Sequence, residues 1–244
     1  MLTIRNITKT FNGIERLKNV SFNLKKGEFL LIAGSNGSGK TLLMKHINGL
    51  YPIKKNTVFL DGEDYYKKDS ELKKKIGIVF QNPDTQFVGL TVEDDIKFGL
   101  KNLGFKKKEI EERTEEILIK LNISHIRDRN PFTLSGGEKK RVNIAGILVM
   151  SPEIIIFDEP FIGLDYPGVI DLTNAILDLK NSGETIILIS HDLEKILAYV
   201  NRVIVLNNGE IVANDTPENI INIVEQWGIR RPVQDKIEDM TWLK

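Results

Sequence analysis

Cysteine is missing from this sequence of 244 residues, and so is any excess of one charge. The absence of cysteine excludes disulfide bonds, thiolate metal sites and a cysteine nucleophile. Lys plus Arg and Asp plus Glu each number 34, so the formal net charge is zero. A neutral chain argues against nucleic acid as the main partner, although it leaves room for a local basic patch.

Long hydrophobic runs are also missing. The longest, such as residues 29–33 and 154–157, hold about five residues or fewer, whereas a helix that crosses a bilayer needs roughly 20 apolar residues. Residues 1–10 mix Arg and Lys with polar residues and lack the apolar core of a signal peptide. We therefore expect the protein to work in the cytoplasm and to reach a membrane only through a partner.

Apolar residues make up 41% of the chain and charged residues 28%, values typical of a folded globular protein. Period-2 alternation, short apolar runs and helical spacing predict an α/β fold. We expect strands at residues 2–7, 20–24, 28–33, 57–60, 76–80, 154–157, 185–190, 203–206 and 210–212. We expect helices at residues 40–48, 106–122, 135–150 and 169–180.

The domain organisation follows from this order of elements. Residues 1–216 are expected to form one domain, in which residues 82–149 are a mainly helical lobe. Residues 217–244 form an extension that contains both tryptophans, Trp227 and Trp242. This extension could add contacts in a dimer, or it could simply pack on its own domain. Its first helix is expected to have Thr216 as N-cap and Pro217 in the first turn.

A glycine-rich loop carries the clearest chemistry. Residues 34–41 fit G-x-x-x-x-G-K-[ST] between an apolar strand and a helix. Such a loop wraps backbone N–H groups around phosphate oxygens, and side chains would obstruct that approach. The spacing of the glycines does not fit the dinucleotide pattern G-x-G-x-x-G. The residues expected to bind ATP here are Gly34, Ser35, Asn36, Gly37, Ser38, Gly39, Lys40 and Thr41.

Lys40 can reach the β and γ phosphates, and the Thr41 hydroxyl can ligate Mg²⁺. A second metal-side element follows the apolar run 154–157, where Asp158 and Glu159 stand next to each other. A buried strand that ends in a carboxylate delivers Asp158 to a Mg²⁺ ion at the edge of a sheet. Glu159 is then placed to orient or deprotonate the attacking water. Asp-Glu after an apolar run is weak evidence alone and strong evidence beside the phosphate loop.

Residues 134–138, Leu-Ser-Gly-Gly-Glu, lie between these two motifs. Here the sequence resembles the ATP-binding-cassette (ABC) ATPases, whose signature is Leu-Ser-Gly-Gly-Gln/Glu, and the resemblance covers roughly residues 2–216. It implies a P-loop NTPase fold with a RecA-like core, an antiparallel β subdomain and a helical subdomain. Ser135 can cap the following helix, and the two glycines bare backbone N–H groups for an anion. In this family, Ser135, Gly136, Gly137 and Glu138 would complete the ATP pocket of a second subunit.

The resemblance also assigns roles to single residues. Gln81 looks like the Q-loop glutamine, which senses Mg²⁺ and water, and His191 looks like the switch histidine at the γ-phosphate. Asp165 lies in a D-loop that faces across a dimer, and Phe11 lies where an aromatic ring often stacks on adenine, or alternatively is a core aromatic at a strand end. The chain departs from the family at Phe161 and Ile162, which are bulkier than the small residues common before the D-loop.

The stretch 81–100 closely resembles the Q-loop region of A-type ATPase subunits in energy-coupling-factor (ECF) transporters, which import vitamins and transition-metal ions. The resemblance implies a second ATPase subunit, identical or different, a membrane T subunit that docks near residues 82–99, and a membrane S subunit that binds the substrate. Asp84, Glu93, Asp94 and Asp95 could receive basic residues of the T subunit, and Phe87 and Val88 could anchor it. Residues 91–94 could also simply start a helix, and both roles can hold together.

These features predict a cytoplasmic ATPase subunit on the inner face of the membrane, with ATP and Mg²⁺ and without a nucleic-acid partner. Glu159, His191 and Gln81 are the expected catalytic residues, and Thr41, Gln81 and Asp158 the expected metal ligands. The alternatives are an ATPase of a conventional ABC importer or exporter, a soluble cassette of DNA repair, chromosome organisation or translation, and an iron–sulfur assembly scaffold. The chain has no long coiled-coil insertion and only one cassette, which argues against the soluble class.

Overall fold

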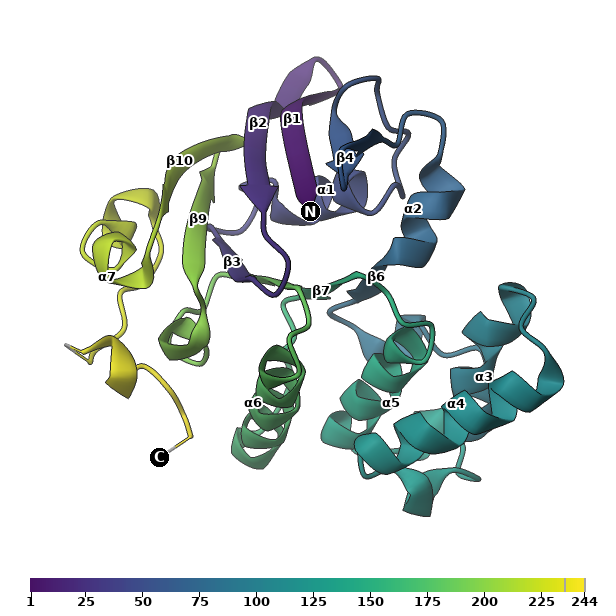
Figure 1. The fold of residues 1–244 in the computed structure, drawn as a ribbon. Coiled ribbons are helices and arrows are strands. Elements are labelled where there is room, and N and C mark those ends of the chain that lie inside the picture. The colour runs from purple at the N-terminus through teal and green to yellow at the C-terminus, as the bar shows by residue number, and fades with distance from the viewer. Residues whose placement is uncertain (235, 244) are drawn as a thin grey trace.

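The structure is a computed structural model that describes residues 1–234 and 236–243. It contains a four-stranded sheet, a six-stranded sheet and a group of helices at one side (Figure 1). The smaller sheet is antiparallel, with strand order β2-β1-β4-β5. Its strands are β1 (Leu2–Phe11), β2 (Ile14–Leu24), β4 (Val58–Leu60) and β5 (Glu63–Asp64).

The larger sheet has the order β10-β9-β3-β8-β7-β6, and every neighbouring pair is parallel except β9 with β10. Its central strands are buried throughout, as expected of parallel strands covered on both faces. The strands are β3 (Phe29–Ala33), β6 (Ile76–Val79), β7 (Ile154–Asp158), β8 (Ile186–Ser190), β9 (Arg202–Asn207) and β10 (Glu210–Asp215).

Parallel pairing brings the carboxyl ends of three strands to one edge of this sheet. Ala33 lies opposite Ser190, and Asp158 lies opposite Ile189. The phosphate loop leaves β3 here, β7 ends in Asp158, and His191 directly follows β8. Segments that are far apart in the sequence therefore meet at the edge where ligands bind in open α/β sheets.

Seven α-helices are described. They are α1 (Lys40–Ile47), α2 (Asp69–Lys75), α3 (Val92–Asn102), α4 (Lys107–Lys120), α5 (Gly136–Leu148), α6 (Tyr166–Asn181) and α7 (Pro217–Ile220). Short 3₁₀ turns are η1 (Pro83–Thr85), η2 (Ser124–Ile126), η3 (Pro131–Thr133), η4 (Leu197–Tyr199), η5 (Val224–Trp227) and η6 (Ile237–Asp239).

The two faces of the larger sheet belong to two different cores. On β3, Leu30 and Ile32 pack with α1 and the smaller sheet, whereas Phe29 and Leu31 pack with the cluster that includes α5 and α6. This division follows from the period of two along a strand. As a result, α1 and α5 cover opposite faces of the sheet.

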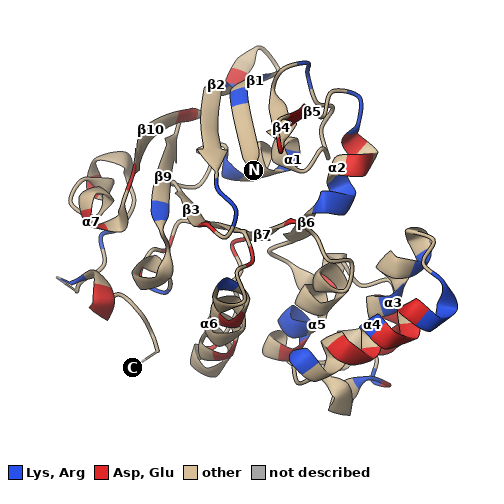
Figure 2. Cartoon of the chain, viewed as in Figure 1, with Lys and Arg blue, Asp and Glu red and all other residues tan. Residues whose placement is uncertain are grey.

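Helices α3, α4 and α5 form a lobe beside the sheet, at the lower right of Figure 1. Figure 2 shows acidic and basic residues close together on α3 and α4. Glu93 is paired with Lys97 at 2.8 Å and with Arg127 at 2.9 Å, and Lys97 also reaches Glu111 at 2.5 Å. These hydrogen-bonded cations lower the pKa of Glu93 to about 2. The charges of the lobe are thus largely used to hold the lobe together.

The α/β class and the overall element order confirm the sequence prediction, but several details differ. The predicted strands 2–7 and 20–24 are too short, because β1 and β2 continue into a long hairpin. Helix α2 was not predicted, because its one buried residue, Leu72, leaves no apolar period to detect. Thr216 is the N-cap residue of α7, but its side chain makes no capping hydrogen bond. The division of the chain at residue 216 stays a prediction.

The C-terminal segment packs on the rest of the chain. Ile229 and Met240 are almost fully buried in the core that contains α5 and α6. The ring of Trp242 lies against Tyr166 at the start of α6, with ring centroids 5.7 Å apart, and Trp227 is partly buried in the same core. Both tryptophans therefore make contacts within their own chain.

Candidate active site

The phosphate loop is built around glycines at positions that disfavour any side chain. A Cβ atom on Gly34 would lie 2.4 Å from the carbonyl oxygen of Leu206, so the backbone of β9 leaves no room for a side chain. Gly37 and Gly39 have φ angles of +82° and +108°, in the left-handed region that favours glycine. The loop then enters α1 at Lys40, which aims the start of a helix at the loop.

Lys40 is folded back onto this loop. Its Nζ donates hydrogen bonds to the carbonyl oxygens of Gly34 (2.7 Å) and Ser35 (3.0 Å) and lies 3.9 Å from Oε1 of Glu159. Burial lowers the pKa of the Lys40 ammonium, and the carboxylates of Glu159 and Asp158 oppose that shift. The side chain is thus held above the loop as a cation, in position to meet phosphate oxygens.

Two oxygen donors suited to Mg²⁺ lie next to each other. The Thr41 hydroxyl donates to Oδ2 of Asp158 at 3.5 Å, and Oδ1 of Asp158 is buried with no hydrogen-bond partner among the described residues. Burial, and then the nearby Glu159, raise the pKa of Asp158. A divalent cation would supply the missing partner of Oδ1, and hydroxyl and carboxylate oxygens are the ligands that Mg²⁺ prefers. The residues present therefore fit Mg²⁺.

Glu159 is joined directly to His191. Its Oε1 accepts hydrogen bonds from the backbone N–H of His191 (3.1 Å) and lies 2.8 Å from Nδ1 of the same residue, and its Oε2 accepts from the Ser190 hydroxyl at 3.2 Å. Glu159 has a φ of +47°, which is unusual for a residue other than Gly or Asn. Sequence reasoning missed Ser190, because nothing marks a strand-end serine as a carboxylate partner.

Gln81 is placed differently. It follows β6 at the same edge of the sheet, but its side chain is exposed. Within the described residues, no hydrogen bond joins this side chain to Thr41, Asp158 or Glu159. Its backbone carbonyl accepts a hydrogen bond of 2.5 Å from Nζ of Lys140, a buried residue of α5. Burial lowers the pKa of Lys140 to about 8, against the attraction of Asp158.

Phe11 ends β1 with 38% of its surface exposed, so the alternative of a core aromatic is wrong. Its ring meets the edge of Tyr51 at 6.1 Å between centroids, and the ammonium of Lys9 lies about 5 Å from both ring centroids. Tyr51 lies in turn against His46 of α1. An exposed ring with supported edges could stack on a planar base. The sequence did not point to Tyr51, which is 40 positions from Phe11.

The signature motif forms the start of α5. Ser135 and Glu138 make a capping box: the N–H of Glu138 donates to Oγ of Ser135 (3.3 Å), and the N–H of Ser135 donates to Oε2 of Glu138 (2.8 Å). Backbone hydrogen bonding from Ser135 lowers the pKa of Glu138. Gly136 and Gly137 follow in the first turn, where helix N–H groups are unpaired and anions bind.

The signature motif shares a cavity of about 520 Å³ with the D-loop residues Gly163, Leu164 and Asp165. The side chain of Asp165 caps α6, since its Oδ1 accepts from the N–H of Gly168 at 3.0 Å. Of the two unusual residues before the D-loop, Phe161 is buried in the core and Ile162 is 42% exposed.

The structure therefore brings the predicted residues together in two separate groups. Residues of the phosphate loop, Asp158, Glu159 and His191 form the first group at the edge of the larger sheet. The signature and D-loop residues form the second group, which depends on α5 and α6. Because α1 and α5 cover opposite faces of the sheet, one chain does not close both groups on the same nucleotide.

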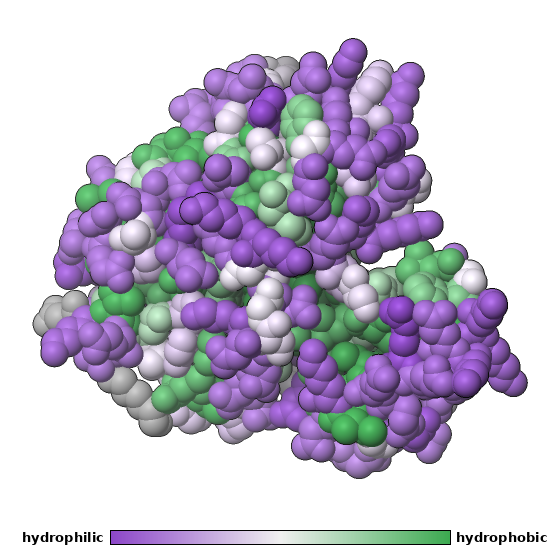
Figure 3. Space-filling view, in the orientation of Figure 1, coloured by the Kyte–Doolittle hydropathy of each residue, from purple (hydrophilic) through white to green (hydrophobic). Residues whose placement is uncertain are grey.

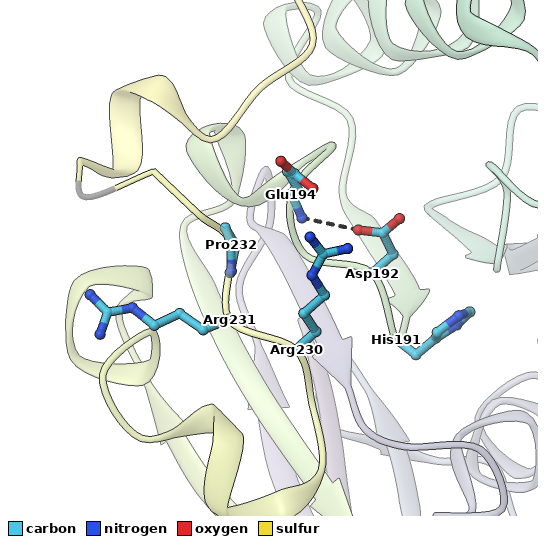
Figure 4. A pocket seen from close by; sticks show the side chains of 6 residues that line it. All are labelled: His191, Asp192, Glu194, Arg230, Arg231 and Pro232. Carbon is cyan, nitrogen blue, oxygen red and sulfur yellow. Dashed lines mark hydrogen bonds between the residues drawn. The ribbon is translucent and has the colours of Figure 1, made fainter.

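A cavity of about 220 Å³ adjoins the first group. It lies between the residues after β8 and the C-terminal segment, and Arg230 and Arg231 line it with His191 (Figure 4). The two arginine side chains diverge, and that of Arg231 points away from His191 (Figure 4). The amide of Gln234 donates to Glu194 across this boundary at 3.3 Å. The C-terminal segment thus lies against the switch histidine loop.

The acidic residues expected to bind the T subunit make hydrogen bonds and ion pairs within their own chain. Asp84 is paired with Lys139 at 2.8 Å, and Asp95 accepts hydrogen bonds from the N–H groups of Val88 and Gly89. Glu93 belongs to the ion-pair network of the lobe described above. Asp94 accepts a hydrogen bond from the N-cap Thr91, so residues 91–94 do start a helix. Glu93 and Asp95 thus stabilise the lobe, and their role in docking stays a prediction.

The two apolar residues predicted to anchor the T subunit, Phe87 and Val88, differ in their exposure. Phe87 is only 7% exposed and belongs to the core, so its prediction as a docking anchor is wrong. Val88, Leu90 and Phe98 are 59%, 80% and 47% exposed. Asp95 binds the loop at residues 88–89, and Phe98 is one turn further on the same face of α3. Figure 3 shows hydrophobic surface on the upper part of this lobe.

Comparisons with known proteins agree with this geometry. The model of the ABC transporter family matches residues 17–162. The energy-coupling factor transporter ATP-binding protein EcfA of Methanothermobacter thermautotrophicus is 42% identical over 229 residues, which cover 92% of this chain and 74% of that protein. The chain belongs to the ABC transporter family. Its similarity to EcfA places this ABC ATPase in the energy-coupling-factor branch.

Solved structures extend the comparison to the fold. CbiO1 of Clostridium perfringens, described as part of the ABC transporter complex cbiONQ, matches this ABC ATPase with a TM-score of 0.83, 33% identity and 92% coverage of each chain. The dimeric, ADP- and Pi-bound cassette MJ0796 matches with a TM-score of 0.78, 28% identity, and coverage of 89% of this chain and 99% of that one. The predicted family, fold class and ATPase activity are confirmed.

Proposed function

We propose that this ABC ATPase works as one of two ATPase subunits that drive an ECF-type importer. The observation that carries this proposal is the separation of the site residues into two groups, one at the edge of the larger sheet and the other at the starts of α5 and α6. A second subunit in head-to-tail arrangement would present its signature residues to the nucleotide on the first. ATP would then lie between Lys40 and Thr41 of one chain and Ser135 and Gly137 of the other.

The chemistry assigned to each residue follows from its surroundings. Gly34 to Gly39 leave room for phosphate oxygens beside the backbone, and Lys40 would exchange its loop carbonyl partners for the β and γ phosphates. Thr41 and Asp158 would hold Mg²⁺, which neutralises phosphate charge when bound. Gln81 would join them after a change of side-chain orientation, because it is exposed in this structure. Phe11 would stack on the adenine ring.

Glu159 is the proposed base for the attacking water. In the structure both its carboxylate oxygens accept hydrogen bonds from Ser190 or His191. These bonds fix the orientation of the carboxylate at the edge of the sheet where the γ-phosphate would lie. His191 is half-exposed and would turn to the γ-phosphate, so the Glu159–His191 pair would report on the occupancy of the site.

The membrane side of the proposal rests on the helical lobe. Among residues 1–234 and 236–243, no helix combines the length and apolar composition that a membrane span needs. The exposed side chains of Val88, Leu90 and Phe98 offer an apolar surface to cytoplasmic helices of a T subunit, and a substrate-binding S subunit would join through it. Association with the membrane would then be peripheral, at its cytoplasmic face.

The test of the proposed function is the variant Glu159→Gln in the assembled transporter. The amide keeps the shape of the side chain but cannot accept the proton of water, so we expect the ATPase kcat to fall at least about 100-fold. ATP binding should persist, because the phosphate loop is unchanged. A matched control, Glu153→Gln, alters a half-buried carboxylate before β7 that is paired with Lys75. Unimpaired hydrolysis in Glu159→Gln would reject Glu159 as the base.

A further inference from the structure

Three side chains of the signature helix α5 bind the segment that follows β6. Nζ of Lys140 donates to the carbonyl oxygen of Gln81 at 2.5 Å, and Nδ2 of Asn143 donates to Oε1 of Gln86 at 3.3 Å. Nζ of Lys139 donates to Oδ1 of Asp84 at 2.8 Å. We call these three contacts, between α5 and residues 81–86, the Q-loop clamp.

The segment is tied to β6 as well. Oε1 of Gln86 also accepts from the backbone N–H of Phe80 (3.0 Å), and its Nε2 donates to the carbonyl oxygen of Ile78 (3.3 Å). Residues 81–86 therefore form a short loop. Its last residue, Gln86, is hydrogen-bonded to β6 and to α5, and its earlier residues Gln81 and Asp84 are hydrogen-bonded to α5. A shift of the loop would therefore either break these hydrogen bonds or move the partner with it.

Burial distinguishes two of the clamp residues from ordinary surface contacts. Lys140 is 2% exposed and Asn143 4% exposed, whereas Lys139 lies nearer the surface. Withdrawing an ammonium group from water is unfavourable unless its donors are satisfied. The carbonyl of Gln81 is the hydrogen-bond acceptor that the described residues give to Lys140. An apolar side chain would pack at lower cost, so packing alone does not account for this lysine.

Helix α5 carries both the signature motif and the residues of the Q-loop clamp. The first turn of this helix carries Ser135, Gly136 and Gly137, and Lys140 follows one turn later on the same rigid element. The loop that it holds connects Gln81 with the exposed residues Val88 and Leu90. The clamp thus joins the surface proposed for docking to the motif proposed to bind a second subunit's nucleotide.

We propose that Lys140 and Asn143 are positioning residues that fix the place of residues 81–86 relative to the signature motif on α5. The proposal rests on the proposed function for the identity of the docked partner and of the nucleotide. Neither residue needs to touch ATP, because both act through the placement of α5 relative to the Q-loop. Arg141 lies between them in the sequence and is paired with Asp171 of α6 at 2.5 Å. This ion pair also connects α5 to α6, the helix that follows the D-loop.

The experiment compares Lys140→Met with Lys120→Met in the full chain, alone and assembled with its membrane subunits. Lys120 is an exposed residue at the end of α4, outside the proposed machinery. We expect Lys140→Met to lower the ATPase kcat about tenfold, which is the usual effect of a mutation on the energetic coupling between two sites. The KM for ATP should stay within about twofold of the wild type. The double variant with Asn143→Leu should lose no more than the larger single loss, because both residues hold one loop.

Hydrogen exchange of the backbone amides separates positioning from simple support of the fold. Exchange at residues 81–86 should rise in Lys140→Met and not in Lys120→Met, with the melting temperature nearly unchanged. A uniform rise along α5 with a lower melting temperature, or wild-type kcat and exchange, would overturn the proposal. The exchange measurement needs no turnover, so it tests the clamp even if Glu159→Gln were to leave hydrolysis intact and the proposed function failed.

Discussion

At the scale of single residues, the site uses its charges in pairs. Lys40, Asp158 and Glu159 lie together at the end of the sheet, where burial raises the pKa of Asp158 and lowers that of Lys40. Both pKa shifts favour the uncharged form of the group, and the opposite charge next to each group partly offsets its shift. The opposite charges of Lys40 and the two carboxylates explain why these three buried groups are tolerated within one site. A phosphate group would add a negative charge next to Lys40, and a divalent cation would add a positive charge next to Asp158.

His46 gives a prediction at this scale. It is buried beneath Tyr51, its Nε2 has no hydrogen-bond partner in the described part of the chain, and burial, followed by Lys9 and Lys54, lowers its pKa to about 4. The unfolded chain therefore binds a proton below about pH 6.5 that the folded chain refuses until about pH 4. Stability should fall over this window as pH falls, by roughly 1–2 kcal/mol at pH 5.

The measurement is the difference in melting temperature between pH 7 and pH 5. We expect this difference to be smaller by several degrees in His46→Phe, which keeps a ring but cannot be protonated. The control His125→Gln alters an exposed histidine and should keep the acid sensitivity of the wild type. Equal acid sensitivity in His46→Phe and the wild type would contradict the assignment.

At the scale of elements, helix α3 and the loop before it do two tasks. Their carboxylates hold the lobe together, and their exposed apolar side chains remain available to a partner. Because Asp95 fixes the loop at residues 88–89, Val88 and Leu90 are presented on an ordered backbone. An ordered apolar surface loses little conformational entropy on binding, which favours its use as an interface.

The variant Leu90→Asp tests this surface. Leu90 is 80% exposed, so the change should leave the fold intact but place a charge in the proposed interface. We expect retention of the membrane subunits in co-purification to fall about tenfold, as for an interface residue of moderate importance. Ile119→Asp, at an exposed position on α4 of the same lobe, is the matched control. If both variants retain the membrane subunits like the wild type, docking at this surface is refuted.

At the scale of the whole molecule, the C-terminal segment belongs to the fold. Ile220, Ile221, Val224, Ile229 and Met240 of this segment are buried in the main core. The segment also contacts Tyr166 at the start of α6, Tyr199 in η4 and Glu194 after β8. Truncation after Gly228 removes Ile229 and Met240, each of which contributes about 1.5–3 kcal/mol by burial.

We therefore expect the truncated chain to melt at least about 5 °C below the wild type in a calorimetric scan. The single change Val233→Ser affects a residue of the same segment that is 75% exposed, and it should shift the melting temperature by about 1 °C or less. An unchanged melting temperature after truncation would mean that the segment does not support the core.

The sequence by itself determined the local motifs of the candidate nucleotide site. The phosphate loop, Asp158 with Glu159, and the signature motif are local patterns, because a strand followed by a glycine turn and a helix builds its anion site without help from distant residues. For the same reason, the strands and helices around these motifs were predicted to within a few residues. The family resemblance added His191 and Gln81, whose roles depend on their order along the chain.

Only the tertiary structure decided which side chains meet across long distances. It joined Glu159 to Ser190 and His191, Phe11 to Tyr51, and Lys140 to the Q-loop, and no short pattern encodes such pairs. It also paired Glu93 of α3 with Lys97 and Arg127 of the same lobe, where these cations lower the cost of its charge. The physical reason is that local hydrogen bonding fixes the elements, whereas burial and charge pairing depend on how those elements pack.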